Sequence, residues 1–279
     1  MIPDPLSENS PDPTTAPEHF ALITGASSGI GACFARALAA RGRHLVLVAR
    51  SKDKLEALKS EIAARHSLRI EVIEQDLGLE GAAQRLATTL TKRGIAVDLL
   101  VNNAGFGAHG QFWKLPLERQ AEMLRLNIVT LTELTYLLLP AMVERSGGGI
   151  INISSTASIQ PVPYMNVYAA TKAYVTSFSM GLAEEVREYG VKVLALCPGG
   201  TATNFFAAGQ FAKIDFVGGL QSPEAVVEVG LRAFDRGQSL AVTRFYNKLM
   251  IFAQRLVSRR FAAAQAGNMF RPKTLDGRE

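Results

Sequence analysis

Hydrophobic and polar positions follow two alternating patterns along the chain. Short runs that are apolar throughout predict strands, and they lie at residues 20–24, 44–49, 69–74, 98–102, 149–154, 192–197 and 240–244. Longer stretches with apolar residues three or four apart predict helices, and they lie near residues 30–40, 53–65, 80–92, 117–144, 166–189 and 222–236. Continuously apolar strands are typical of a parallel sheet covered on both faces.

This alternation predicts an α/β fold with a single doubly wound domain. Seven strands would form a parallel sheet with helices on both faces. A TIM barrel is the alternative, but it requires an eighth strand and helix that the pattern lacks. Residues 1–17 hold five prolines among polar residues, which predicts a disordered leader, so we expect the domain to span residues 18–244.

Composition agrees with one intracellular domain. The length of 279 residues, 48% of them hydrophobic, suits one substantial core. The two cysteines, Cys33 and Cys197, stand apart in apolar stretches, and the four histidines are scattered, so we expect neither disulfides nor a metal site. With no secretion signal and no uninterrupted apolar segment of about 18 residues, we expect a cytoplasmic protein.

The net charge of +5 is concentrated near the C-terminus. Residues 237–275 contain seven basic residues and no acidic one, which leaves 23 basic and 25 acidic residues elsewhere. We therefore expect no nucleic-acid partner. Residues 245–279 form a basic extension, in which 245–264 predict one amphipathic helix. Docking of this helix on the domain or on a second subunit is the favoured interpretation, and peripheral binding to anionic lipid is the alternative.

A glycine-rich turn follows the first predicted strand. In the segment "LITGASSGIG", Gly25, Gly29 and Gly31 lie where the strand ends and a helix begins. Glycines at such a turn let a pyrophosphate approach the backbone N–H groups of the helix N-terminus. The turn therefore predicts nucleotide binding, with Ser27, Ser28 and Ile30 as neighbouring contacts.

The spacing T-G-x3-G-x-G resembles that of the short-chain dehydrogenase/reductase family. Further motifs follow in the family's order, namely Asp76–Leu77, "NNAG" from Asn102, Asn127, "NISS", "YAATK" and "PGGTAT". The resemblance covers about residues 20–205 and implies a Rossmann-type fold, an oxidoreductase that interconverts a carbonyl and a secondary alcohol, and a homodimer or homotetramer. It also implies further cofactor contacts at Asp76, Leu77, Asn103, Ala104, Gly105, Tyr168, Lys172, Pro198, Gly199, Thr201 and Thr203.

The end of the second predicted strand indicates which nicotinamide cofactor binds. An acidic residue there usually binds the ribose of NAD(H), whereas an arginine accommodates the 2′-phosphate of NADP(H). This chain has Arg50 at that position and Lys54 one helical turn later. We expect NADP(H), with NAD(H) as the alternative if Asp53 binds the ribose.

Reduction of a carbonyl requires a proton donor, and three tyrosines surround Lys172 in "YMNVYAATKAY". Tyr168 lies four residues before Lys172, so both side chains share one helix face, unlike Tyr164 and Tyr174. Lowering a tyrosine pKa from about 10 by three units requires roughly 4 kcal/mol of selective phenolate stabilisation, which a nearby ammonium favours.

The family resemblance assigns roles around this pair. Tyr168 would be the general acid or base, and Lys172 would lower its pKa and bind the ribose. Ser155 would orient the substrate oxygen, and Asn127 would hold a water linked to Lys172. We expect Ser154, on the opposite side of the strand from Ser155, to be a structural hydroxyl.

The loops around the expected site are largely apolar. Their residues favour an apolar substrate and are Phe106, Pro161, Val162, Tyr164, Met165, Phe205 and Phe206. Residues 204–221 resemble a mobile lid, and His109 is interpreted as an exposed loop histidine, with substrate contact as the alternative. Two other functions stay open: a regulatory protein that binds the cofactor, and a membrane-associated adaptor that uses the basic helix.

Overall fold

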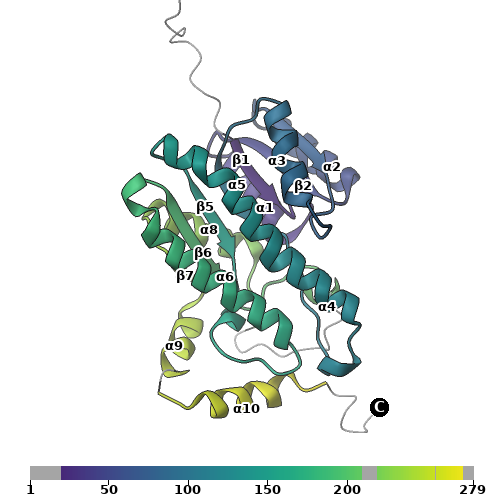
Figure 1. Cartoon of the computed structure of the whole chain (residues 1–279), viewed down its shortest axis with the longest axis vertical. Helices are drawn as coiled ribbons and strands as arrows, with labels where there is room; N and C mark the ends of the chain where they lie inside the picture. Colours follow the sequence, from purple (N-terminus) through teal and green to yellow (C-terminus); the bar gives the residue numbers. More distant parts are fainter. Residues whose placement is uncertain (1–19, 209–218, 255, 273–279) are drawn as a thin grey trace, which may run out of the picture.

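A seven-stranded parallel sheet forms the centre of the computed structural model, which describes residues 20–208, 219–254 and 256–272 (Figure 1). The strands are β1 (Phe20–Thr24), β2 (His44–Ala49), β3 (Ile70–Glu74), β4 (Val97–Asn102), β5 (Gly149–Ile153), β6 (Lys192–Cys197) and β7 (Leu240–Val242). All seven predicted strands are confirmed, with ends that shift by at most two residues. The predicted leader, residues 1–17, and most of the predicted lid lie outside the described residues.

The helices follow the predicted pattern closely up to residue 235. They are α1 (Gly29–Ala39), α2 (Lys52–Ala63), α3 (Ala82–Lys92), α4 (Leu117–Leu124), α5 (Leu131–Glu144), α6 (Asn166–Glu185), α7 (Phe205–Ala208), α8 (Pro223–Asp235), α9 (Phe245–Gln254) and α10 (Arg259–Phe270). Short 3-10 turns lie at Phe112–Lys114, Thr156–Ser158 and Arg187–Tyr189. A π-helical turn, Arg125–Thr130, joins α4 to α5.

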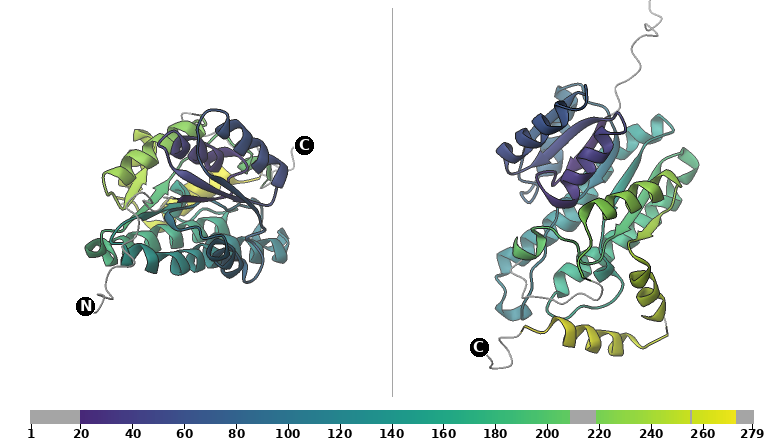
Figure 2. Two further views of the ribbon diagram at one scale, coloured as in Figure 1. Left: turned by 90° about the horizontal axis from the view of Figure 1, so that it is seen from above. Right: turned by 180° about the vertical axis from the view of Figure 1, so that it is seen from behind.

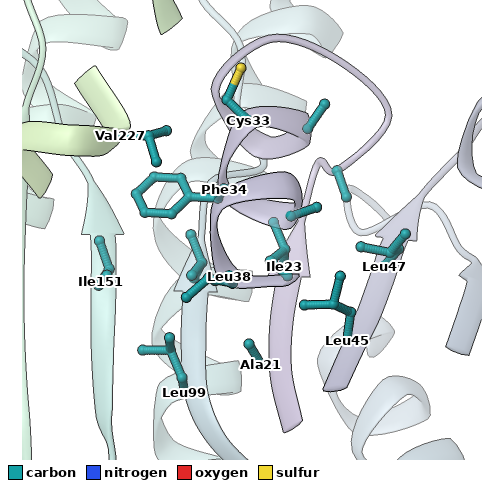
Figure 3. Packing of buried hydrophobic residues seen from close by; sticks show 14 of the residues in the cluster. Ala21, Ile23, Cys33, Phe34, Leu38, Leu45, Leu47, Leu99, Ile151 and Val227 are labelled. Carbon is teal, nitrogen blue, oxygen red and sulfur yellow. The ribbon is translucent and has the colours of Figure 1, made fainter. Parts of the chain in front are cut away.

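Successive strand residues point to opposite faces of the sheet, and each face has its own helical layer (Figure 2). Ile23 belongs to one apolar cluster with Phe34 and Leu38 of α1 and Val227 of α8, and Figure 3 shows Val227 beside Phe34. Leu22, the neighbour of Ile23, packs in the other cluster, whose helical members come from α3, α5 and α6. Both faces are therefore apolar, which explains why the strands are apolar throughout.

The strand order β3-β2-β1-β4-β5-β6-β7 places a change of direction between β1 and β4. From β1 the chain builds the sheet outward to β3, then returns to the other side of β1 and continues to β7. In open α/β sheets, ligands bind beyond the carboxyl ends of the strands at this change of direction. The glycine-rich turn after β1 lies there.

The helical run Leu117–Glu144 is long and apolar enough to cross a membrane by length and composition alone. Core helices of sheet-covering layers pass the same test. In this chain Leu134 and Met142 of α5 are buried with Leu22 and Leu100 of the sheet. Packing on the sheet therefore explains the apolar residues on the buried side of this run.

The prediction of one helix over residues 245–264 is wrong. Two helices, α9 and α10, cover this region, and Ser258 begins the second because its side chain accepts a hydrogen bond from the Phe261 N–H at 3.2 Å. In Figure 1, α9 leads away from the sheet and α10 runs across that end of the molecule. Lys248 and Arg259 therefore belong to different helices.

Candidate active site

A cavity of about 480 Å³ lies at the carboxyl ends of the strands. It brings together most of the predicted site residues, which are Gly25, Ser27, Ser28, Gly29, Ile30, Arg50, Asp76, Leu77, Asn103, Ala104, Gly105, Ser155, Tyr168, Lys172, Pro198, Gly199, Thr201 and Thr203. Three predicted residues, Gly31, Lys54 and Asn127, do not line it. The predicted nucleotide contacts and the predicted catalytic pair therefore share one cavity.

The turn after β1 is so tight that glycine is required at two positions. Gly25 has φ +66°, and a Cβ on it would lie 2.8 Å from Asn103 Nδ2. A Cβ on Gly31 would lie 2.4 Å from the Gly25 carbonyl oxygen, a severe clash. Gly31 therefore serves the shape of the turn and does not line the cavity.

The N-terminus of α1 is suited to an anionic group. Ser28 is the N-cap residue, and its side chain makes no capping hydrogen bond. No acidic residue lies in the first turn, and Ser28, Gly29 and Ile30 line the cavity. The free N–H groups and the helix dipole therefore face the cavity and can bind a phosphate.

Hydrogen bonds tie this turn to the end of β4. The Thr24 hydroxyl accepts hydrogen bonds from the N–H groups of Asn103 and Ala104, both at 2.9 Å. Asn103 Nδ2 donates to the carbonyl oxygens of Thr24 at 2.9 Å and Gly25 at 3.1 Å. These contacts hold the two neighbouring loops at a fixed separation.

Arg50 supplies positive charge at the end of the cavity near β2 and β3. Its side chain is 67% exposed, and its Nη1 lies 3.9 Å from both Asp76 Oδ2 and Glu122 Oε1, which is too long for a hydrogen bond. Lys54 and Asp53, also on α2, are exposed and do not line the cavity. Arg50, without Lys54, is therefore placed to contact a ligand there.

Tyr168 and Lys172 are both buried on one face of α6. The Lys172 Nζ lies 5.8 Å from the Tyr168 ring centre and donates a hydrogen bond to the Ile153 carbonyl at 2.7 Å. Burial raises the pKa of Tyr168 to about 12, although a hydrogen bond with Ser155 opposes this shift. Burial also lowers the pKa of Lys172 to about 8. The tyrosine pKa in this structure is therefore raised, whereas the resemblance implies that it is lowered.

The two adjacent serines differ as the sequence predicts. Ser155 lines the cavity, and its Oγ accepts a hydrogen bond from the Ala157 N–H at 3.1 Å. Ser154 also borders the cavity, but its hydroxyl is buried, donates to the Lys172 carbonyl at 2.9 Å and contacts Thr176 Oγ1 at 2.6 Å. The Ser154 hydroxyl thus joins β5 to α6.

Asn127 lies in the π-helical turn and is fully engaged with its neighbours. Its Nδ2 donates to the Phe106 carbonyl at 3.0 Å and to Thr171 Oγ1 at 3.1 Å, while its Oδ1 accepts from the Phe106 N–H at 3.2 Å. A Cβ on Gly105 would lie 2.8 Å from this Oδ1. Asn127 therefore holds the loop after β4 close to α6. π-Helical turns are frequent at functional sites.

The apolar loops contribute to the cavity only in part. Phe106, Val162, Met165, Phe205 and Phe206 line it, whereas Pro161 and Tyr164 do not. The half-buried His109 does not line it either, and its Nε2 lies 2.7 Å from the Phe270 carbonyl oxygen. His109 thus contacts α10, an interaction that neither sequence interpretation included.

The last residue of the predicted domain, Arg244, and the C-terminal extension supply cavity residues that the sequence interpretation missed. These are Arg244, Tyr246, Asn247, Met250, Ile251, Gln254, Met269 and Phe270. A signal for them was present, because Met250 and Ile251 give α9 a second apolar face opposite Phe245, Leu249 and Phe252. The preference for docking on the domain is consistent with this arrangement.

The chain is similar to known proteins over most of its length. The family model described as short chain dehydrogenase matches residues 19–211. The human very-long-chain 3-oxoacyl-CoA reductase is 37% identical over 199 residues, which are 70% of this chain and 61% of that protein. The chain thus spans less than two thirds of the length of this curated relative.

Two solved structures are similar over most of the chain. A short-chain dehydrogenase from Sphingobium yanoikuyae in complex with NADPH is 31% identical, with a TM-score of 0.76, and the match covers 85% of this chain and 94% of that one. A bulky-bulky ketone specific alcohol dehydrogenase from Comamonas testosteroni is 31% identical, with a TM-score of 0.73, and the match covers 85% and 92% of the two chains.

The lowered pKa of Lys172 predicts a pH-dependent stability. Between pH 8 and 10.5 the unfolded chain binds more protons at this lysine than the folded chain, so stability rises with pH across that window. We expect the free energy of unfolding of the wild type, relative to Lys172→Met, to rise by about 2–3 kcal/mol between pH 7 and pH 10. Chemical denaturation at both pH values measures this difference.

Lys54→Met is the matched control, because Lys54 is exposed on α2. The difference in the free energy of unfolding between Lys54→Met and the wild type should stay constant with pH. A constant difference for Lys172→Met as well would show that burial does not perturb this lysine.

Proposed function

The chain belongs to the short-chain dehydrogenase/reductase family of oxidoreductases, and we propose that it interconverts a carbonyl and a secondary alcohol on an apolar substrate with NADP(H). One observation carries the proposal. The glycine turn at the N-terminus of α1 and the Ser155, Tyr168 and Lys172 side chains line the same cavity. A nucleotide bound at the turn would therefore extend toward a proton donor.

The residues present fit NADP(H). The N-terminus of α1 would hold the pyrophosphate, Arg50 the 2′-phosphate, and Asp76 with Leu77 the adenine. A guanidinium can hold a phosphate through two parallel hydrogen bonds, and its long contacts to Asp76 and Glu122 leave its N–H groups available. The cofactor, when bound, supplies or accepts the hydride. The relative from Sphingobium yanoikuyae, a complex with NADPH, supports this choice.

Tyr168 acts as the proton donor in reduction. With a pKa raised to about 12, its phenol is fully protonated at neutral pH and can donate as negative charge develops on the substrate oxygen. Lys172, whose pKa stays near 8, is mostly protonated at pH 7 and stabilises the phenolate that remains. Ser155 would hold the substrate oxygen toward Tyr168. The raised pKa keeps the phenol protonated but makes it a weaker acid, so donation relies on the nearby positive charge of Lys172 to stabilise the phenolate.

The substrate end of the cavity favours a large apolar carbonyl compound. Val162, Met165 and Phe205 form an apolar cluster beside Tyr168, and the Tyr168 and Phe205 ring centres lie 5.3 Å apart. Met250 and Ile251 of α9 and Met269 and Phe270 of α10 extend this apolar lining. The names of the human and Comamonas relatives point to a 3-oxoacyl thioester or a bulky ketone as the substrate class.

Self-association is a further part of the proposal. Leu117 on α4 and Tyr136 on α5 are 74% and 76% exposed. Such side chains on one helical layer suit an interface with a second copy. Multi-angle light scattering tests this part, because a Leu117→Glu and Tyr136→Glu double variant should convert an oligomer into monomers.

Removing the Tyr168 hydroxyl tests the proton donor. We expect Tyr168→Phe to lower kcat for NADPH-dependent ketone reduction by about 10²–10⁴-fold, because no group would then donate the proton. Absorbance of NADPH follows turnover, and NADPH fluorescence shows whether the cofactor still binds. Tyr174→Phe is the control, since Tyr174 contacts Thr132 and lies outside the cavity lining. Retained turnover in Tyr168→Phe would contradict the proposal.

The cofactor preference depends on Arg50. We expect Arg50→Gln to raise KM for NADPH by about 10–100-fold and to leave KM for NADH nearly unchanged, since only the 2′-phosphate loses its partner. Lys54→Gln serves as the control, because Lys54 does not line the cavity. A larger effect of Lys54→Gln than of Arg50→Gln would reverse the assignment.

Substrate size should depend on the inner face of α9. Ile251→Trp narrows the cavity, and we expect it to lower kcat/KM for a long-chain 3-oxoacyl thioester at least about tenfold more than for a short-chain one. Phe252→Trp changes the next residue, which is 60% exposed and does not line the cavity, so it should alter neither value. Equal effects of the two variants would argue that α9 does not form part of the substrate site.

A further inference from the structure

Helix α9 is apolar on two opposite faces. Its inner face lines the cavity with Tyr246, Asn247, Met250, Ile251 and Gln254. Its outer face, continued just past the end of the helix by Leu256, carries apolar side chains at the spacing of a helix, which are Phe245, Leu249, Phe252 and Leu256.

The outer face is strongly exposed. Phe245 and Leu256 are 80% and 77% exposed, and Phe252 and Leu249 are 60% and 53% exposed. Large apolar side chains that share one helix face normally pack against a partner. The outer face of α9 therefore has the character of a contact surface.

Helix α10 continues this surface. Its small residues Ala262 and Ala266 are buried, and a Cβ on Gly267 would lie 3.4 Å from Pro163, so this side of α10 rests on the domain. Phe261 on α10 and Val257 before it are 53% and 40% exposed. In Figures 1 and 2, α9 and α10 lie together at one end of the molecule, away from the sheet.

The charges that this segment itself carries have one sign. Residues 237–275 contain no acidic residue. Lys248, Arg259 and Arg260 are exposed beside the apolar side chains, and none of them pairs with a carboxylate in the described part of the chain. A partner that complements this surface is negatively charged and offers an apolar layer beneath the charge, which are the properties of an anionic lipid surface.

A second copy of the chain complements this surface poorly. In a symmetric dimer the same patch meets itself, so the basic residues of both copies would face one another. Like charges at an interface oppose association. The charge distribution therefore favours lipid over self-pairing at this end of the molecule.

We propose that the outer faces of α9 and α10, namely Phe245, Leu249, Phe252, Leu256 and Phe261 with Lys248, Arg259 and Arg260, bind an anionic membrane surface. One helix, α9, then separates the lipid from the cavity. Apolar substrates that partition into the membrane are concentrated beside the cavity wall. This interaction goes beyond the proposed reaction and does not require it.

Vesicle co-sedimentation of the full chain tests the proposal. The wild type should bind phosphatidylcholine vesicles that contain phosphatidylserine at least about tenfold more tightly than pure phosphatidylcholine vesicles, and added salt should weaken the binding. Phe252→Glu with Leu256→Glu should reduce binding to both vesicles at least about tenfold. Lys248→Gln with Arg260→Gln should reduce binding only to the anionic vesicles.

The control is Leu79→Glu with Tyr189→Glu, which places the same charges at side chains that are 57% and 53% exposed elsewhere on the domain. This control should bind vesicles like the wild type, and circular dichroism with thermal unfolding establishes that each variant is folded. Three results would overturn the proposal. The first is no vesicle binding by the wild type, and the second is an equal loss of vesicle binding in the control and in the α9 variant. The third is an oligomer of the wild type that the α9 variant dissociates, while neither the wild type nor the variant binds vesicles. Because the experiment measures vesicle binding, a protein that shows no turnover would count against the proposed reaction and not against membrane binding.

Discussion

The turn after β1 and the loop after β4 approach each other so closely that a side chain fits at neither Gly25 nor Gly31. Thr24 and Asn103 hold this approach with four hydrogen bonds between the two segments. The start of α1, the edge of the cavity and the position of Gly105 beside Lys172 all depend on this separation. A shift of the turn would move the proposed phosphate site and the loop near the proton donor together.

At the other end of the cavity, burial of a lysine side chain lowers the stability of the folded chain. Lys172 is 6% exposed, and its pKa of about 8 shows that the folded chain disfavours its charge. The hydrogen bond with Ser155 only partly offsets the desolvation that raises the tyrosine pKa to about 12. A protein selected for stability alone would place an apolar residue at position 172. The buried lysine is consistent with the proposed reaction, in which a fixed positive charge would stabilise a developing phenolate.

Local patterns predicted the fold and much of the site because they rest on short-range geometry. Apolar runs gave the strands, and the four-residue spacing of Tyr168 and Lys172 gave their common helix face. Other features depend on long-range contacts. Arg50 follows β2 directly and lines the cavity, whereas Lys54 lies in the first turn of α2 and does not, because the course of α2 relative to the sheet decides whether its side chains reach the cavity. Asn127 acts through a π-helical turn that periodicity does not reveal.

The C-terminal extension shows why one amphipathic pattern was insufficient to predict how its helices pack. The helical period of residues 245–264 identified the apolar stripe of Phe245, Leu249 and Phe252, and a single stripe suggests a single partner. In the structure the opposite face of α9, with Met250 and Ile251, lines the cavity. Ser258 begins a second helix, α10, at the same end of the molecule. The stripe seen in the sequence is therefore the one left exposed after the extension has packed on the domain. Since the inner face of α9 already packs on the domain, the exposed stripe has no partner among the described residues, and the proposed lipid surface would cover it.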